Sequence, residues 1–346
     1  MFRMFKNISI IGDGAMGTAL AMLLAEKNAP VRIWGYDRGQ LHQIATAREN
    51  IKFLPGYKLP EAIIFEPDDK HIMVDADLIV SAVPCQFMRS VWTRLKKFTP
   101  ENIPICSVAK GIENGTLLCP TQIIADVLGG ADARPLAALS GPTIADELVR
   151  KLPATACAAS ADGQLAKKIQ QTFIAPWFRI YTNTDIIGVE LAGAMKNIIA
   201  IAAGIIDGIG AGDNAKAALL CRGLAEISRL GVAMGANPQT FSGLTGLGDL
   251  VTTCISPKGR NRSFGERVGR GETPQQAEAD TESVIEGIAT CKSVVEGLLA
   301  KYKVEMPITE AVYDVLFRNK SVQAAIAELM TRQLKAEHPT AANQKG

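Results

Sequence analysis

Residues 7–21 read NISIIGDGAMGTALA, and the architecture of the chain can be worked out from this stretch. A short β-branched run at 7–11 leads into three glycines with the spacing Gly-x-Gly-x-x-Gly. A helical pattern follows at 18–27, and a second β-branched run lies at 31–34. The order is therefore strand, glycine turn, helix and strand, within a unit of about 30 residues.

The three glycines indicate what this unit binds. Gly12 permits a tight turn, Gly14 lets the backbone approach a pyrophosphate, and Gly17 allows the helix to pack close to the strand. The amides at the start of the helix then face the phosphates. In this context the motif predicts a dinucleotide site.

The rest of the chain divides into two patterns. Further apolar runs lie at 78–83, 105–108 and 136–139, separated by helix-length stretches of mixed polarity. This alternation predicts an α/β fold with a Rossmann-type, doubly wound parallel sheet. Beyond about Asp185 the chain shows long helical periods with glycine and proline punctuation, which predicts an all-α C-terminal domain.

A chain of 346 residues exceeds what one hydrophobic core usually serves, so we expect two domains. We place a dinucleotide-binding Rossmann domain at 1–188 and an all-helical substrate and catalytic domain at 189–336. Residues 337–346 are polar and are predicted to fray.

Composition restricts the class of partner. A net charge of +2 and 5% aromatic residues give neither a basic field for nucleic acid nor many stacking platforms, so a small molecule is expected. The seven cysteines form no Cys-x-x-Cys pair, which predicts reduced, mostly buried thiols and no metal site.

One segment resembles a membrane span by length and composition. Residues 186–209 are almost uniformly apolar, but Glu190, Lys196 and Asn197 interrupt them, and lipid would penalise those groups. We therefore predict a helix buried in protein and no membrane insertion. The first apolar run begins at Ile8, which leaves no room for a secretory signal, so a cytoplasmic location is expected.

Ligands of parallel sheets bind at the carboxyl ends of the strands, so the residues after each predicted strand are candidates. They are 83–86 (VPCQ), 109–111 (AKG) and 140–143 (SGPT). Lys110 stands between Ala109 and Gly111, which predicts that its side chain points into the crevice rather than along a helix face.

Lys196 lies in a helical segment that is apolar on nearly every side. Its ammonium group must therefore be paired, or burial must lower its pKa. Glu190 is six positions away, about 240° around the helix, and so cannot be the partner. Two interpretations stay open: a structural salt bridge to another element, or a base poised to remove a hydroxyl proton.

A third group of residues is rich in glycine and basic side chains. Residues 243–253 read GLTGLGDLVTT, and 256–262 read SPKGRNR. Asp249 is suited to binding a substrate hydroxyl or orienting a lysine, while Arg260 and Asn261 together suit a phosphate. The alternative for the basic run is a solvated face.

The residues that follow the second strand do not settle the cofactor. The acidic residue expected at this strand end comes late, as Asp37. Tyr36 is suited to stacking on the adenosine, and Arg38 to neutralising a 2′-phosphate. The sequence permits either NAD or NADP, and a solvated turn is the other interpretation.

From about Ile8 to about Phe317 the chain resembles the bacterial-type NAD(P)-dependent glycerol-3-phosphate dehydrogenases. The resemblance rests on seven motifs taken jointly: GDGAMGTA, AKG, SGPT, KNIIA, TGLGDL, GRNR and EMPIT. It implies an oxidoreductase that interconverts glycerol 3-phosphate and dihydroxyacetone phosphate. Family members are cytosolic, commonly dimeric, and supply the backbone of phospholipids.

The resemblance also implies roles for individual residues. Lys196 would be the proton acceptor, supported by Lys110, Asp249 and Thr253. Substrate contacts would lie at Lys110, Gly141, Thr143, Lys196, Asp249, Gly259, Arg260 and Asn261. Cofactor contacts would lie at Gly12, Gly14, Ala15, Met16, Gly17, Tyr36, Lys110, Ala145, Arg260, Val284 and Glu286.

Two departures from the family pattern concern the cofactor. Ala15 and Met16 replace the serine and aromatic residue usual after the second glycine, and Tyr36 replaces a residue that is often histidine or another polar type. Two rival functions stay open: another lysine-dependent dehydrogenase, of the 6-phosphogluconate or 3-hydroxy acid type, and a non-catalytic dinucleotide sensor. A sensor would not need Lys110, Lys196 and Asp249 to be present together, whereas all three are present here.

Overall fold

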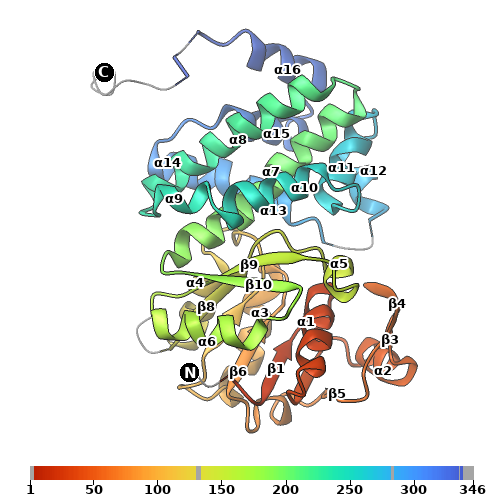
Figure 1. Cartoon of the computed structure of the whole chain (residues 1–346). Helices are drawn as coiled ribbons and strands as arrows, with labels where there is room; N and C mark the ends of the chain where they lie inside the picture. The colour runs from red at the N-terminus through yellow and green to blue at the C-terminus, as the bar shows by residue number, and fades with distance from the viewer. Residues whose placement is uncertain (1–3, 130–133, 282–283, 335, 338–346) are drawn as a thin grey trace.

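The structure is a computed structural model that describes residues 4–129, 134–281, 284–334 and 336–337. Figure 1 shows a sheet-containing part and a helical part, one above the other. The tail predicted to fray at 337–346 lies, apart from residue 337, outside the described residues.

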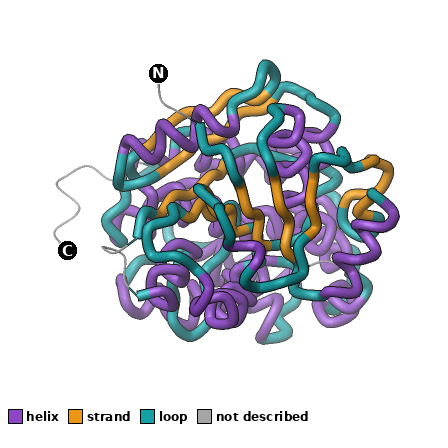
Figure 2. Tube along the Cα trace, turned by 90° about the horizontal axis from the view of Figure 1, so that it is seen from below, coloured by secondary structure: helices purple, strands orange, loops and turns teal. Residues whose placement is uncertain are grey.

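The first part is built on an eight-stranded sheet with the order β10-β9-β8-β7-β6-β1-β2-β5. A separate antiparallel pair joins β3 (Glu49–Asn50) to β4 (Leu54–Lys58). In Figure 2 the strands of the large sheet run side by side with helices on either side. The large sheet comprises β1 (Ile8–Ile11), β2 (Val31–Trp34), β5 (Ile63–Phe65), β6 (Leu78–Ser81), β7 (Ile105–Ser107), β8 (Leu136–Ser140), β9 (Ala154–Ala159) and β10 (Phe178–Asn183).

Both faces of the sheet are buried, because successive side chains of each strand point to opposite sides. Ile10 joins a core on the side of α1, and its neighbour Ile11 joins a second core with Trp34 and Trp92. The helices of this part are α1 (Ala15–Glu26), α2 (Arg38–Ala47), α3 (Cys85–Leu95), α4 (Pro120–Leu128), α5 (Ala145–Val149) and α6 (Gly163–Phe173), with 3₁₀ turns at His71–Met73 and Lys96–Phe98.

The five predicted strands are all present, and the predicted doubly wound architecture is confirmed. The sheet is not purely parallel, however, because β9 runs antiparallel to β8. The five-residue helix α5 between them is too short to return the chain along the sheet, as a parallel connection requires. The pattern did not predict three strands of this sheet: β9, whose sequence ATACAA has one β-branched residue, the three-residue β5, and β10.

Beyond β10 the described residues are helical, as predicted. The longest helix is α7 (Ile186–Gly208), which begins after Asp185, whose carboxylate accepts a hydrogen bond from the Gly188 amide. The other helices of this part are α8 (Asp213–Ala233), α9 (Pro238–Phe241), α10 (Asp249–Ile255), α11 (Arg260–Gly269), α12 (Pro274–Ala279), α13 (Glu286–Ser293), α14 (Leu299–Tyr302), α15 (Pro307–Phe317) and α16 (Val322–Met330), with π-helical turns at Leu244–Gly248 and Val294–Leu298. Helices α8, α9, α10, α11, α13 and α15 pack against α7.

Helix α7 is long and apolar enough to cross a membrane, but 89% of its most apolar window is buried inside the protein. The prediction of a buried helix is therefore confirmed. Glu190, near its start, is also buried, and its carboxylate accepts hydrogen bonds from the Thr121 amide (2.8 Å) and the Thr121 hydroxyl (2.5 Å). Because Thr121 lies in the first turn of α4, this carboxylate ties α7 to the sheet-containing part.

Helices α7 and α11 pack with their backbones in direct contact. A Cβ atom at Gly204 would lie 1.9 Å from the Arg262 carbonyl oxygen, and one at Gly265 would lie 2.0 Å from the Ile201 carbonyl oxygen. No side chain fits at either position. The two glycines therefore set the distance between α7 and α11. They thereby also determine where Arg260, the first residue of α11, lies relative to α7.

We predict that Gly204→Ala lowers the free energy of unfolding by about 2 kcal/mol or more, because the added methyl group must push α11 away. Gly163→Ala is the control, since a Cβ at that helical position meets nothing within 4 Å. It should be neutral or slightly stabilising. Denaturant unfolding of both variants checks this, and equal stabilities would contradict the packing described.

Candidate active site

The glycine turn has the geometry that its sequence predicts. Gly12 has a φ of +119°, and a Cβ there would lie 2.7 Å from the Ala82 carbonyl oxygen on β6's side of the turn. A Cβ at Gly17 would lie 2.2 Å from the Gly12 carbonyl oxygen, so only glycine allows α1 this close to the turn. Around Gly14, by contrast, a Cβ would meet nothing within 4 Å, so the start of α1 is open to a ligand.

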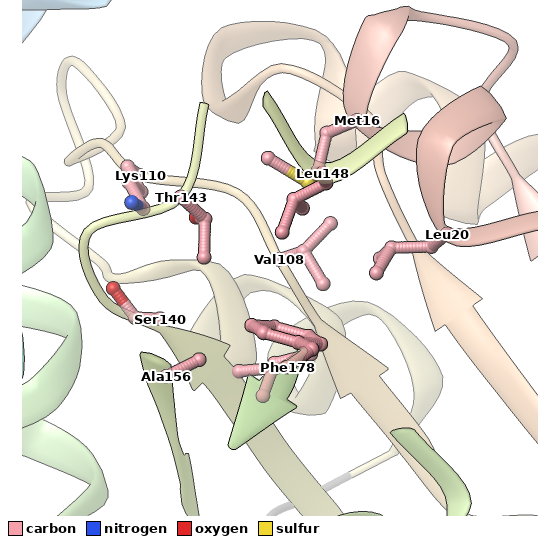
Figure 3. A pocket seen from close by; sticks show the side chains of 10 residues that line it. Met16, Leu20, Val108, Lys110, Ser140, Thr143, Leu148, Ala156 and Phe178 are labelled. Carbon is pink, nitrogen blue, oxygen red and sulfur yellow. The ribbon is translucent and has the colours of Figure 1, made fainter. Parts of the chain in front are cut away.

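A pocket lies beside α1 at the carboxyl ends of the central strands (Figure 3). Its apolar side includes Val108 and Phe178, and Met16 from the glycine turn lies at its edge with Leu148. Its polar groups are those of Lys110, Ser140 and Thr143. Two of the three strand-end segments predicted to line one crevice, 109–111 and 140–143, therefore meet at this pocket, beside the glycine turn.

Asp249 lies next to this pocket and contacts two lysines, one through each carboxylate oxygen. Its Oδ1 is 2.6 Å from the Lys196 Nζ, and its Oδ2 is 2.7 Å from the Lys110 Nζ. The Asp249 side chain is 2% exposed, that of Lys196 8% and that of Lys110 18%. Lys196 also donates to the Thr253 hydroxyl, and Lys110 donates to the Gly141 carbonyl oxygen at 3.0 Å.

The buried position of Lys196 shifts its protonation equilibrium. Burial lowers its pKa to about 8, Asp249 acts in the opposite direction by raising it, and Lys110 lowers it further. Near neutral pH the side chain can therefore exchange a proton. The sequence predicts that Lys196 is either paired or lowered in pKa, and the structure shows both. Glu190, as predicted, is not its partner.

The local backbone explains how Asp249 reaches this position. The π-helical turn at Leu244–Gly248 precedes it, and α10 begins at Asp249 itself. Wide turns of this kind are frequent at functional sites, because they aim side chains in directions that a regular helix does not allow. One turn later on α10, Thr253 lies on the same face and also contacts Lys196.

Asn261 is already engaged within the protein. Its Nδ2 donates to the Asn197 Oδ1 at 3.0 Å, and its Oδ1 accepts from the Gly287 amide at 2.9 Å. Asn197 in turn reaches the Lys110 carbonyl oxygen at 3.4 Å. Asn197 therefore connects Asn261 to the backbone of Lys110. The sequence analysis did not assign this role to Asn197, although its position next to Lys196 could have indicated it.

Arg260, the first residue of α11, has an exposed side chain that interacts electrostatically with Glu286. Glu286 accepts a hydrogen bond from the Cys85 amide at 3.0 Å, and its other oxygen, Oε2, is buried with no hydrogen-bond partner in the described structure. Burial raises the pKa of Glu286 to about 7. Through this hydrogen bond, Glu286 holds the start of α13 against the predicted strand-end segment 83–86. Val284, which is 36% exposed, lies two residues before Glu286.

The predicted ribose-binding residues lie apart from this cluster, after β2. Tyr36 is 63% exposed, with the guanidinium carbon of Arg94 5.3 Å from its ring centroid. Asp37 caps α2, because its Oδ1 accepts from the Gly39 amide at 2.8 Å and the Gln40 amide at 3.2 Å. Ala145 begins α5, which packs against α1.

The predicted state of the cysteines also holds for the described residues, in which Cys85, Cys106, Cys119, Cys157, Cys254 and Cys291 are free and buried. Cys221 is free and exposed.

Two family models together match most of the chain. Residues 7–166 match the N-terminal part of NAD-dependent glycerol-3-phosphate dehydrogenase, and residues 185–327 match its C-terminal part. A protein from Chlorobium phaeobacteroides named glycerol-3-phosphate dehydrogenase [NAD(P)+] is 46% identical over 331 residues, which cover 96% of this chain and 99% of that protein. A protein of the same name from Citrifermentans bemidjiense is 45% identical over 96% of this chain and 99% of its own length.

Comparison with solved structures indicates the same family. The crystal structure of glycerol-3-phosphate dehydrogenase from Coxiella burnetii superposes with a TM-score of 0.90 at 37% identity and covers 94% of this chain and 99% of that chain. A ketopantoate reductase from Ralstonia eutropha, with a TM-score of 0.57 and 14% identity over 90% of this chain and 97% of its own, shares the fold alone. From the matched residues and identities, this chain belongs to the NAD-dependent glycerol-3-phosphate dehydrogenase family.

Proposed function

We propose that this chain is an oxidoreductase that interconverts sn-glycerol 3-phosphate and dihydroxyacetone phosphate with NAD(P)(H). The observation that carries the proposal is the contact of one buried carboxylate, Asp249, with both Lys110 and Lys196 beside the glycine turn. The relatives' names agree with this reaction rather than with the rival dehydrogenases or a sensor. We further propose a cytoplasmic homodimer that supplies glycerol 3-phosphate for phospholipid synthesis.

The roles that we propose for the two parts of the chain follow the predicted domains. Residues 1–188 would bind the dinucleotide, and 189–336 would supply most of the catalytic groups. The open approach at Gly14 and the start of α1 fit a pyrophosphate, and Met16 at the pocket edge fits an apolar cover for a ring. When bound, the nicotinamide cofactor supplies or accepts the hydride at C2 of the substrate.

Lys196 has the position and protonation behaviour of the acid–base group. An ammonium group has three N–H donors, and two of those on Lys196 point to Asp249 and Thr253. The third is left for the substrate oxygen at C2. In reduction Lys196 gives a proton to the ketone oxygen, and in oxidation its neutral amine takes the hydroxyl proton, for which a pKa of about 8 is suitable.

The charge of the cluster suits a phosphorylated substrate. Lys110 and Lys196 together carry up to two positive charges against the one negative charge of Asp249, so an anion is attracted to the pocket. Arg260 adds an exposed guanidinium at the start of α11, where the helix dipole also favours a phosphate. The remaining substrate contacts implied by the resemblance are Gly141, which accepts a hydrogen bond from Lys110, Thr143, which lines the same pocket, and Gly259 and Asn261, which flank Arg260.

The reaction itself is tested by mixing purified protein with NADH, and separately with NADPH, and then adding dihydroxyacetone phosphate. We expect rapid oxidation of the cofactor with the phosphorylated ketone and at least about 100-fold less with dihydroxyacetone, because a charged, hydrogen-bonded phosphate is lost. Absorbance at the reduced-nicotinamide band follows the rate. A folded protein that binds dinucleotide but turns over neither ketone would refute the proposal.

We expect Lys196→Met to lower kcat by about 10²–10⁴-fold, the usual contribution of a positioned proton donor. Methionine keeps the length of the side chain, and Lys110 still pairs with Asp249, so cofactor affinity should change little. Lys292→Met, which replaces an exposed lysine on α13, is the matched control and should retain full turnover. Near-normal kcat in Lys196→Met would exclude it as the acid–base group.

Arg260→Gln should act chiefly on substrate binding, because the change removes a charge proposed to hold the phosphate but leaves Lys196 in place. We expect KM for dihydroxyacetone phosphate to rise by at least about tenfold, corresponding to roughly 1.4 kcal/mol, with a smaller change in kcat. Steady-state kinetics check this. An unchanged KM would assign the phosphate to other groups.

A further inference from the structure

Asp13, the residue between the first two glycines of the turn, carries a carboxylate that lies outside the cluster around Asp249. Its Oδ2 is buried and has no hydrogen-bond partner in the described structure. A Cβ atom at Gly35 would lie 2.7 Å from this oxygen and 2.8 Å from the Asp13 Cγ. The Asp13 carboxylate therefore fills the space that a side chain at position 35 would otherwise occupy.

Position 35 has a particular meaning, because it follows β2 directly. In dinucleotide-binding folds, an acidic side chain at the end of the second strand accepts hydrogen bonds from the adenosine ribose of NAD. Here that position is glycine, and the nearby Asp37 is occupied in capping α2. A carboxylate is nevertheless present at this point, but it is delivered from the glycine turn.

The surrounding groups hold Asp13 in place without satisfying it. Asn50 donates from its Nδ2 to the Asp13 backbone carbonyl oxygen at 2.8 Å and to the Thr18 hydroxyl at 2.8 Å, which fixes the turn. Burial raises the pKa of Asp13, and a hydrogen bond from its own backbone amide lowers it. The charge of Asp37 acts to raise this pKa, and that of Lys52 acts to lower it. An unpaired buried carboxylate oxygen is costly, so a ligand hydroxyl that donated to it would stabilise the site.

We propose that Asp13 accepts a hydrogen bond from the 2′-hydroxyl of the adenosine ribose and thereby makes this chain prefer NADH to NADPH. The inference rests on the proposed function only in requiring a nicotinamide dinucleotide as ligand. A 2′-phosphate would bring negative charge against the Asp13 carboxylate. Arg38, the residue suited to neutralising that phosphate, lies where its charge also acts on Asp68 and Asp69.

The test measures dissociation constants of NADH, 2′-deoxy-NADH and NADPH by fluorescence titration, without substrate. Wild-type protein should bind NADH about 10- to 100-fold more tightly than either of the other two ligands, the usual range for a hydrogen bond to a charged group. In Asp13→Ala, NADH and 2′-deoxy-NADH should bind equally, because the acceptor is gone. In Asp13→Asn, which keeps the shape, the preference for NADH over NADPH should shrink by at least about tenfold.

Asp162→Asn is the matched control. It makes the same change at the N-cap of α6, where asparagine still caps the helix and the charge does not act on Asp13, so the ratio of the three affinities should stay close to that of wild type. Thermal unfolding of each variant separates a loss of fold from a loss of discrimination.

Equal binding of NADH and 2′-deoxy-NADH by the wild-type protein would overturn the inference, as would an unchanged NADH-to-NADPH ratio in Asp13→Asn. Protein that discriminates between NADH and 2′-deoxy-NADH, and loses this in Asp13→Ala, supports the role of Asp13 even if it fails to reduce dihydroxyacetone phosphate. In that case only the proposed reaction is refuted.

Discussion

The site depends on one buried carboxylate that holds two lysines. Asp249 is almost inaccessible to water, so its charge would be costly without partners, and Lys110 and Lys196 each contact one of its oxygens. The two lysines come from different parts of the molecule. Lys110 follows strand β7 of the sheet-containing part, and Lys196 lies on α7 of the helical part. The same ion pairs that compensate the buried charge therefore join the two parts at the pocket and set the protonation of Lys196.

Helix α7 makes this arrangement possible. Along one helix, Glu190 binds the start of α4, Lys196 contacts Asp249, and Asn197 links the Lys110 backbone to Asn261. Further along, Gly204 brings α11 into backbone contact. A largely buried helix thus positions the acid–base group relative to the sheet on one side and the proposed phosphate-binding residues on the other.

Much of the fold and part of the candidate site could be predicted from sequence, because they depend on patterns among residues that are close together along the chain. The glycine turn follows from spacing, and the need of Lys196 for a partner follows from its apolar neighbours. The partner itself could not be predicted by periodicity, since Asp249 is 53 residues away along the chain. The antiparallel β9 was missed because its alanines carry little strand preference. Asp13 was missed because its role depends on Gly35, which only the fold brings beside it.

The central claim is that burial and the Asp249 contact tune Lys196 for proton transfer. The most direct measurement is an NMR titration of protein labelled with ¹³C at the lysine Cε, in which the signal absent from Lys196→Met identifies the residue. We predict that this signal titrates with a pKa near 8, well below the ordinary lysine value of 10.5. A Lys196 signal that titrates near the ordinary value of 10.5 would contradict the account.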